Sequence, residues 1–376
     1  MIARTLYPVL LSHLHSSQKG ILLYGPRQSG KTTLMHQLID ALGVKTTLFD
    51  ADARGSWWEA LVSRELEAIG RVIAPYDLLC FDEAQRIPEA GLILKIIRDV
   101  FPQKRLIVTG SSSLDLASRV SEPLTGRMYS FKLFPISQSE LRTMYTSLES
   151  QEKLEERLIY GSYPEIFSYK GNEEKSAYLT NLINGYLYKD MLEFGGLRNA
   201  NKIINLLKLL SFQIGSQVSI QEISASLELN RGTVERYIDL LEKSFVIFRV
   251  SGFSRNLRTE IRKMDKIYFI DTGVRNALIG NMNALSNRDD GGRLWENFLM
   301  VERRKHLAYA HALYTQYFWR THNGAELDLI EERDGKLYGF EFKFSHKAPR
   351  APASFLAAYP AASYTVVNKD TWYDFV

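Results

Sequence analysis

The sequence is poor in the residues that build disulfides and zinc sites. It contains one cysteine, Cys80, in 376 residues. A disulfide framework or a cysteine-rich zinc site within one chain is therefore excluded. Cys80 stands inside an apolar strand pattern, which favours a buried structural thiol over a nucleophile. The seven histidines show no spacing typical of metal ligands.

Long apolar runs are also missing. The longest runs, such as Ile21–Leu23 and Leu78–Phe81, are far too short to cross a bilayer. Residues 1–13 lack the basic segment, the long apolar core and the small-residue cleavage site of a secretion signal. We therefore expect no membrane partner and a cytoplasmic location.

The composition is that of a folded globular protein, with 45% hydrophobic and 24% charged residues. A chain of 376 residues is too long for one core, so we expect two to four units. The net charge is +4, but residues 197–275 alone carry 13 Lys or Arg against 8 Asp or Glu. A basic surface there is permissive for nucleic acid without being evidence for it.

The first third of the chain alternates short apolar strands with helical stretches. The expected strands are Ile21–Tyr24, Thr46–Phe49, Leu78–Phe81, Leu106–Thr109 and Phe131–Phe134. Helices between apolar strands are typical of a parallel sheet covered on both faces, so we predict an α/β fold. From Glu140 to about Phe212 the pattern is helical. The last part, from Leu294, is expected to run helix, strand, strand, helix, strand.

One segment matches the phosphate-binding loop pattern in full; it consists of Gly25, Pro26, Arg27, Gln28, Ser29, Gly30, Lys31 and Thr32. An apolar strand precedes it, and a helix-like stretch beginning at Thr33 follows. Glycines let the backbone curl so that N–H groups face phosphates, and the helix N-terminus adds partial positive charge. We expect Lys31 to reach the β- and γ-phosphates of ATP and Thr32 to offer its hydroxyl to Mg²⁺. A glycine turn between strand and helix is the alternative.

A second element of an ATP site follows one strand-helix unit later. Asp82 and Glu83 come directly after the apolar run Leu78–Phe81. Asp82 is expected to hold magnesium through its water shell, and Glu83 to orient and polarise the attacking water. A P-loop kinase fits less well, because Glu83 suits water activation and no phosphate-acceptor pocket is evident.

Two further residues are candidates for the same site. Ser111 follows the strand Leu106–Thr109 and could touch the γ-phosphate or the attacking water, although a plain turn is the alternative. Arg127, after Gly126, is a candidate arginine finger, with an exposed surface arginine as the alternative. The sequence leaves open whether Arg127 serves its own site or a neighbouring one, and therefore whether the chain forms a homo-oligomer.

These motifs resemble those of prokaryotic AAA-type ATPases whose C-terminal region is catalogued only as a domain of unknown function. The resemblance rests on residues 25–33, 80–85, 109–113, 124–127 and 134–141. It continues through residues 160–165, 230–241, 266–273, 324–328 and 341–343. The glycine after Tyr160 is usually doubled in that group, and here Ser162 replaces the second one. The resemblance implies ATP binding and brings no settled biological role.

The middle of the chain has the pattern of a winged helix. Residues 219–243 predict a helix-turn-helix, and strands 246–251 and 266–270 would form its hairpin. Val234, Ile238 and Leu241 recur at helical spacing and would bury the second helix. The face that carries the following residues is mostly acidic and would repel phosphates: Arg231, Glu235, Asp239 and Glu242.

Basic residues gather instead on the hairpin, between residues 255 and 266; they are Arg255, Arg258, Arg262, Lys263 and Lys266. One hypothesis is that DNA contacts this hairpin. The alternative is that the hairpin packs between domains.

The C-terminal region carries a set of acids and a lysine at strand spacing. Glu341 and Lys343 share one face of a strand, and Asp328 shares a face of the preceding strand with Glu326. Glu296 sits on an amphipathic helix before them. This order resembles the core of restriction-endonuclease-like nucleases, in which Glu296, Asp328 and Glu341 would hold magnesium and Lys343 would help activate water. A nuclease-like fold retained as a scaffold or a binding platform is the alternative.

We therefore predict four parts: a P-loop ATPase domain at 1–145, a helical lid at 146–215, a winged helix at 216–285 and a restriction-endonuclease-like domain at 286–376. The favoured function is a magnesium-dependent ATPase coupled to a nucleic-acid-directed activity. The competing hypothesis is a nucleotide-controlled switch whose C-terminal domains serve protein interaction.

Overall fold

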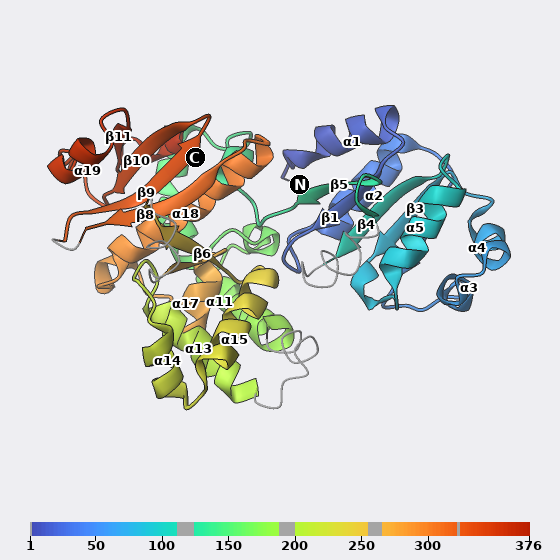
Figure 1. The fold of residues 1–376 in the computed structure, drawn as a ribbon, viewed down its shortest axis with the longest axis horizontal. Coiled ribbons are helices and arrows are strands. Elements are labelled where there is room, and N and C mark those ends of the chain that lie inside the picture. The colour runs from blue at the N-terminus through green and yellow to red at the C-terminus, as the bar shows by residue number, and fades with distance from the viewer. Residues whose placement is uncertain (1, 111–123, 188–199, 255–264, 322–323) are drawn as a thin grey trace. The chain divides into compact units, whose positions relative to one another are not determined.

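The computed structural model describes residues 2–110, 124–187, 200–254, 265–321 and 324–376. The chain separates into two compact units (Figure 1). The first unit comprises residues 1–136 and 243–245, and the second comprises residues 137–242 and 246–376. Within the described residues, none of the helices combines the length and the apolar character that a membrane crossing requires.

The first unit is built on a five-stranded sheet in the order β2-β3-β4-β1-β5. All its strand pairs are parallel. The strands are β1 (Gly20–Tyr24), β2 (Thr46–Asp50), β3 (Leu78–Asp82), β4 (Arg105–Gly110) and β5 (Met128–Lys132). The predicted α/β fold with a parallel sheet is confirmed. The fifth strand was expected at Phe131–Phe134, and it begins earlier because Met128 and Tyr129 already pair with β1.

Helices cover both faces of this sheet; they are α1 (Leu6–Ser16), α2 (Lys31–Leu42), α3 (Trp58–Ser63), α4 (Leu66–Ile73), the 3-10 turn η1 (Ala84–Arg86) and α5 (Ala90–Val100). One face, with Leu22, Phe81 and Val108, packs on apolar residues of α3, α4 and α5. On the other face Cys80 is buried, as predicted, and its burial raises the pKa of the thiol to about 12. Cys80 is therefore not a nucleophile at neutral pH.

The second unit begins with helices. These are α8 (Gln138–Leu141), α9 (Ser147–Glu152), α10 (Leu154–Tyr160), η3 (Pro164–Ser168), α11 (Asn172–Leu182), η4 (Ile183–Leu187), α13 (Ala200–Phe212), α14 (Ile220–Leu227) and α15 (Arg231–Lys243). Val234, Ile238 and Leu241 are buried on α15, as their spacing predicted. Later helices are α17 (Thr272–Leu278), η5 (Leu285–Asn287), α18 (Gly291–Tyr309), α19 (Ala353–Ala358) and α20 (Trp372–Phe375).

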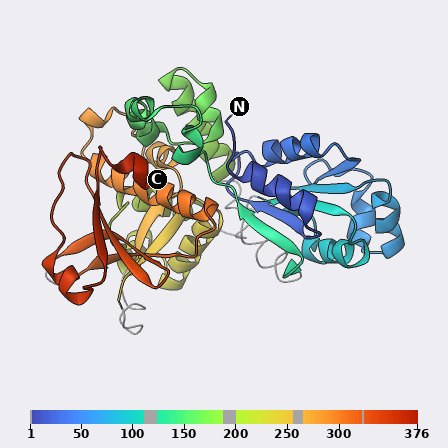
Figure 2. The ribbon, with the colours of Figure 1, turned by 90° about the horizontal axis from the view of Figure 1, so that it is seen from above.

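A six-stranded mixed sheet completes the second unit, in the order β11-β10-β9-β8-β6-β7 (Figure 2). Its strands are β6 (Ile247–Gly252), β7 (Lys266–Phe269), β8 (Thr315–Arg320), β9 (Glu326–Arg333), β10 (Lys336–Phe342) and β11 (Ser363–Val367). Three strands lie between α18 and α19, one more than the sequence pattern indicated. The pattern over β8 is weak, because only two of its six residues are fully buried.

The hairpin expected to be a wing belongs to this larger sheet. β6 pairs antiparallel with β7 on one side and parallel with β8 on the other, through Ser251 and Gly252. Residues 146–215, 286–376 and all of 216–285 except 243–245 lie in the second unit. The boundaries predicted between these parts stay predictions.

Two of the segments that carry the family resemblance meet in a buried polar joint. Asp271 accepts hydrogen bonds from the backbone N–H groups of Ser162 at 2.7 Å and Val274 at 3.1 Å. Gly161 has a positive φ of 69°, and a Cβ atom there would lie 1.9 Å from the Asp271 carboxylate. Asn276 donates to the carbonyl oxygens at the end of α10. These residues hold α10 against α17, which gives them a structural role.

Candidate functional site

The phosphate-binding loop leaves the carboxyl end of β1 and enters α2. Gly25 has φ 157°, and a Cβ atom at this position would lie 2.0 Å from the carbonyl oxygen of Leu133. Gly30 caps α2 in the left-handed conformation with φ 94°. Glycine is required at Gly25 because the Leu133 carbonyl leaves no room for a Cβ atom. Glycine is favoured at Gly30 because it adopts the left-handed conformation without strain. Of the other loop residues, Arg27 is half-buried, while Gln28, Thr32 and Thr33 are exposed.

The Lys31 side chain is buried against the loop itself. Its ammonium donates to the carbonyl oxygens of Gly25 at 3.1 Å and Pro26 at 2.9 Å. The hydroxyl of Ser29 is buried and has no hydrogen-bond partner in the described structure. The Lys31 ammonium can exchange its two carbonyl partners for phosphate oxygens, and the Ser29 hydroxyl is available to bind one. Together with the N–H groups of the loop, these groups fit the phosphates of a nucleotide.

The loop is tied to the rest of the first unit by Arg4, a buried residue that the sequence pattern did not single out. Its guanidinium donates to the carbonyl oxygen of Ser29 at 2.7 Å and to that of Phe134 at 2.6 Å. Arg4 lies 25 residues before Ser29 and 130 before Phe134, so no local pattern could have indicated this contact.

Three neighbouring strands deliver the acidic part of the site. The Thr32 hydroxyl donates to Oδ2 of Asp82 at 2.8 Å. The Thr109 hydroxyl, from β4, donates to Oδ1 of the same carboxylate. The backbone N–H of Glu83 in turn donates to the Thr109 oxygen at 3.1 Å. A threonine hydroxyl beside a buried carboxylate supplies oxygen ligands of the kind that Mg²⁺ prefers, so the residues present fit this ion.

Glu83 follows Asp82 in a left-handed backbone conformation, with φ 49° and ψ 45°. Its carboxylate accepts a hydrogen bond from the side-chain amide of Gln85. A non-glycine residue in this conformation at the tip of a strand is uncommon and is often associated with function. Glu83 directly follows Asp82 at the end of β3, and its role as the water-activating base stays a prediction.

Of the two residues expected to complete this site, Ser111 lies outside the described residues. Thr109, two residues earlier, contacts Asp82 and the backbone of Glu83 through its hydroxyl. The sequence contained an indication of this residue, because Thr109 is the only polar side chain of β4 after Arg105.

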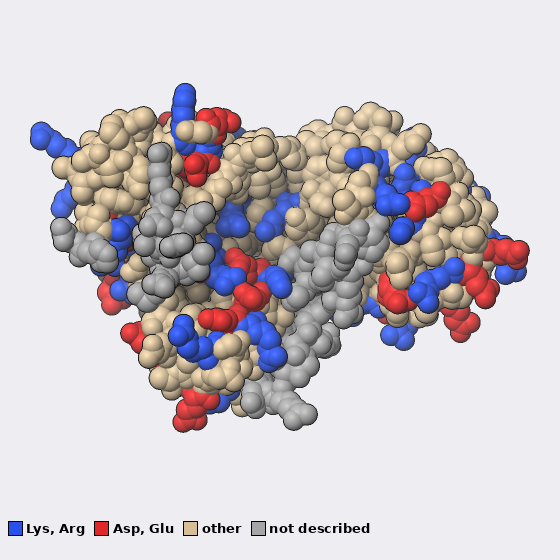
Figure 3. All heavy atoms as spheres, viewed as in Figure 1, with Lys and Arg blue, Asp and Glu red and all other residues tan. Residues whose placement is uncertain are grey.

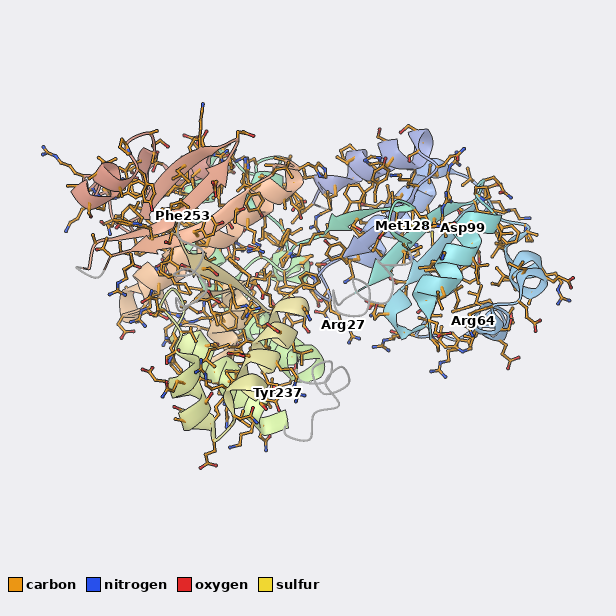
Figure 4. All side chains as sticks on the ribbon, viewed as in Figure 1. Arg27, Arg64, Asp99, Met128, Tyr237 and Phe253 are labelled. Atoms are coloured by element: carbon orange, nitrogen blue, oxygen red, sulfur yellow. The ribbon has the colours of Figure 1, made fainter. Side chains whose placement is uncertain are left out.

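Arg127 lies at the opposite end of the sheet from the phosphate-binding loop. It precedes Met128, which pairs with Gly20 at the amino end of β1, and its carbonyl accepts from Gly20 at 3.0 Å. Since β1 spans about 13 Å, Arg127 does not reach its own loop. Instead it forms two hydrogen bonds to Asp99 of α5, at 2.6 and 3.0 Å. In Figure 4, Arg27 of the loop lies well apart from Met128 and Asp99.

In the second unit the structure brings together the acids predicted from the C-terminal pattern. Asp328 of β9 and Glu341 of β10 lie on adjacent antiparallel strands. Oδ2 of Asp328 accepts the backbone N–H of Phe342 at 2.7 Å, and Lys343 forms an ion pair with Glu341. Desolvation, together with the nearby charge of Glu296, raises the pKa of Asp328 to about 7. Desolvation and Asp328 likewise raise the pKa of Glu341.

The same cluster contains a lysine that the sequence assigned elsewhere. The Lys266 ammonium, from β7, lies 3.1 Å from Oε1 of Glu296 and 2.7 Å from Oε1 of Glu326. Its side chain is 3% exposed, so it is not part of an exposed basic hairpin, which corrects its assignment as a DNA contact. The other four basic residues of that hairpin, Arg255, Arg258, Arg262 and Lys263, lie outside the described residues.

The C-terminal carboxylates are paired with lysines in this arrangement. Among the residues that the structure describes, no three His, Cys, Asp or Glu side chains are placed to hold one. The positive charge among the acids is provided by Lys266 and Lys343. Metal ligation by Glu296, Asp328 and Glu341 therefore stays a prediction.

The acidic face of α15 is partly neutralised within the second unit. Arg249 of β6 contacts Asp239 at 2.6 Å and Glu242 at 2.9 Å. These two acids thus help hold α15 on β6. On the face shown in Figure 3, basic and acidic side chains are interspersed over the described part of the chain.

Comparison with known proteins agrees with this description. Residues 17–142 match the family described as an AAA domain, and residues 151–285 and 291–375 match two domains of unknown function, DUF8612 and DUF4143. The uncharacterised proteins Mb2031c of Mycobacterium bovis and Rv2008c of Mycobacterium tuberculosis are each 32% identical over 327 residues, covering 86% of this chain and 70% of theirs.

Among solved structures, the Walker-type ATPase PABY2304 of Pyrococcus abyssi matches with a TM-score of 0.50 and 16% identity. The match covers 74% of this chain and 96% of that one, and at this identity it concerns the fold alone. The relatives, the matched domains and the phosphate-binding loop agree. The chain belongs to the family of AAA-type P-loop ATPases that carry a C-terminal domain of unknown function.

Proposed function

We propose that this protein hydrolyses ATP with Mg²⁺ in its first unit. The observation that carries the proposal is the run of hydrogen bonds from Thr32 through Asp82 and Thr109 to the backbone of Glu83. This run joins the carboxyl ends of β1, β3 and β4, where parallel α/β sheets bind their ligands. It supports the proposal because it links the proposed magnesium-holding residues to the backbone of the proposed base.

Each residue has a distinct part in the proposed reaction. Lys31 exchanges the loop carbonyls for the β- and γ-phosphates, and the loop N–H groups bind the same oxygens. Thr32 and Asp82 hold the magnesium ion, which supplies charge neutralisation between the β- and γ-phosphates. Glu83 orients the attacking water and takes its proton, while Thr109 keeps Asp82 and the Glu83 backbone in register.

The test is phosphate release from ATP by the purified full-length chain. We expect turnover in the presence of Mg²⁺ and its loss when EDTA removes the ion. Binding of ATP without any magnesium-dependent release would leave a nucleotide-binding protein and contradict hydrolysis.

The position of Arg127 supports action on a neighbouring copy of the chain. Because it lies at the amino end of the sheet, it can approach an ATP site only from outside that subunit. Its partner Asp99 is exposed, so the ion pair is available for exchange. We therefore propose a homo-oligomer in which Arg127 contacts the γ-phosphate held by the adjacent subunit.

A second proposed activity is directed at nucleic acid and resides in the second unit. It is favoured by the juxtaposition of Asp328, Glu341 and Lys343 on adjacent strands, the order expected of a nuclease-like site. The predicted winged helix and its basic hairpin 255–266, without the buried Lys266, would contact DNA in the cytoplasm. The competing proposal is a nucleotide-controlled switch, favoured by the absence of a three-carboxylate metal cluster in the described residues.

ATP turnover with and without single- and double-stranded DNA separates these two proposals. Stimulation by DNA supports the nucleic-acid-directed enzyme. Turnover that is indifferent to DNA, together with intact DNA after incubation with Mg²⁺ or Mn²⁺, supports the switch.

A further inference from the structure

We infer that Lys266 is the resident cation of the C-terminal carboxylate cluster, so that this cluster excludes divalent metal ions while Lys266 remains in place. The cluster is defined here as Glu296, Glu326, Asp328 and Glu341. The inference concerns the residues of the second proposed activity, and only its consequence for DNA cleavage rests on that proposal.

The geometry places the ammonium among the acids. Lys266 is within 3.1 Å of Glu296 and 2.7 Å of Glu326, two residues on different elements, α18 and β9. Tyr268 donates its hydroxyl proton to Oε1 of Glu296 at 2.6 Å, the same oxygen that Lys266 contacts. Because side chains two residues apart share one face of a strand, β7 presents Lys266 and Tyr268 together.

The charge on Lys266 is stabilised by its surroundings. Burial alone would lower the pKa of this ammonium, but Glu296, Glu326 and Asp328 together raise it above its ordinary value. The two ion pairs, at 3.1 and 2.7 Å, support a charged ammonium at this position. A buried ammonium with two carboxylate partners is held strongly, since its departure would leave both carboxylates without their counter-ion.

The remaining acids of the cluster are also engaged within the protein. Asp328 accepts the N–H of Phe342, and Glu341 is paired with Lys343. A divalent ion entering the cluster would have to displace Lys266 from Glu296 and Glu326 against the repulsion between the two positive charges. The lysine has a further advantage, because it is tethered to the site and acts at a high effective concentration.

The experiment measures Mn²⁺ binding, without nucleotide, by isothermal titration and by the electron paramagnetic resonance signal of free Mn²⁺. All proteins are full-length and carry Asp82→Asn, which removes the carboxylate of the ATP site. We compare the protein that retains Lys266 with two variants. Lys266→Met keeps most of the apolar stem, and Lys266→Arg keeps the charge. We expect one saturable Mn²⁺ site in Lys266→Met, bound at least about tenfold more tightly than by the other two proteins.

Two controls keep the result interpretable. Lys266→Met with Asp328→Asn should lose the gained site, which shows that the cluster provides it. If Lys266→Met is too unstable to purify, Lys266→Met with Glu326→Gln removes one uncompensated charge and should still bind Mn²⁺ more tightly than the protein with Lys266. Stoichiometric Mn²⁺ binding by the protein with Lys266, equal to that of Lys266→Met, overturns the inference.

The outcome is separable from that of the cleavage proposal. A Lys266→Met protein that binds Mn²⁺ and leaves DNA intact contradicts cleavage while supporting the role of Lys266. A Lys266→Met protein that binds no Mn²⁺ contradicts the role of Lys266, whatever the protein does to DNA.

Discussion

The hydroxyl of Thr109 contacts the carboxylate of Asp82 at the boundary between β4 and β3. The same oxygen accepts the N–H of Glu83 at 3.1 Å, so one side chain orders both acidic residues of the ATP site. Thr109 is fully buried, and water cannot replace its hydroxyl without a rearrangement of the strand ends.

Replacing Thr109 by valine tests this arrangement, because valine keeps the shape and removes the hydroxyl. A buried hydrogen bond to a charged group contributes about 1.5–3 kcal/mol, so we expect turnover to fall by about tenfold or more. ATP affinity should change less, since Lys31 and the loop are untouched. Measured kcat and ATP Kd check the prediction, and Thr109→Ser, which retains the hydroxyl, should preserve most activity. Equal loss in both variants would contradict it.

Lys31→Ala and Glu83→Gln should separate ATP binding from hydrolysis. Lys31→Ala removes the side-chain counter-ion of the phosphates, so ATP binding should weaken by at least about tenfold. Glu83→Gln should bind ATP normally and lose about 10²–10⁴-fold in turnover, because an amide cannot act as a base. Titration with a fluorescent ATP analogue and phosphate release provide the two measurements. Undiminished turnover in Glu83→Gln would show that another group activates the water.

Arg127→Ala should lower turnover while leaving ATP affinity nearly intact. Mixing Arg127→Ala with Glu83→Gln protein should restore part of the activity, because the ATP site of an Arg127→Ala subunit, with its intact Glu83, then receives an intact Arg127 from a Glu83→Gln neighbour. Phosphate release across a range of mixing ratios measures this complementation. Asp99→Asn is the matched control: it breaks the same exposed ion pair, which contributes little to stability, and should keep normal turnover. No complementation on mixing would rule out action between subunits.

Arg4→Gln should weaken the attachment of the phosphate-binding loop. It leaves the carbonyl oxygens of Ser29 and Phe134 without their donors, at a cost of about 1–3 kcal/mol for each buried group left unsatisfied. We expect lower thermal stability and weaker ATP binding. Arg4→Lys should recover only part of both, because an ammonium cannot reproduce the planar fork that spans two carbonyls. Thermal unfolding with and without ATP is the measurement. Full rescue by lysine would show that charge alone accounts for the role of Arg4.

The proposed DNA affinity should depend on the hairpin residues outside the described structure. Charge reversal at Arg258, Arg262 and Lys263 should weaken binding and flatten its salt dependence, because fewer counterions are released. Glu235→Gln and Asp239→Asn should not weaken DNA binding. Asp239→Asn could tighten DNA binding, because it releases Arg249 from its ion pair. Fluorescence anisotropy at several salt concentrations measures both effects. A clear loss of affinity in Asp239→Asn would contradict this assignment.

Several features of the protein follow from its sequence alone. The phosphate-binding loop is contiguous, and its glycines, Lys31 and Thr32 act through the backbone geometry of one short segment. The Asp82–Glu83 pair is equally local, because it sits at the end of a strand whose apolar run is legible in the sequence. Alternating strands and helices also predicted the parallel sheet. Such features are accessible because chain neighbours determine them.

Other features were decided by tertiary structure. The strand order β4-β1-β5 and the parallel register with Gly20 place Arg127 at the far end of the sheet from the loop. The approach of Arg4 to Ser29 joins segments that no periodicity connects. The sequence indicated that Lys266 was one of several basic hairpin residues. The pairing of β6 with both β7 and β8 makes β7, and with it Lys266, part of the C-terminal sheet. Contacts across such sequence separations depend on how strands order and pack, and local patterns carry no information about that order.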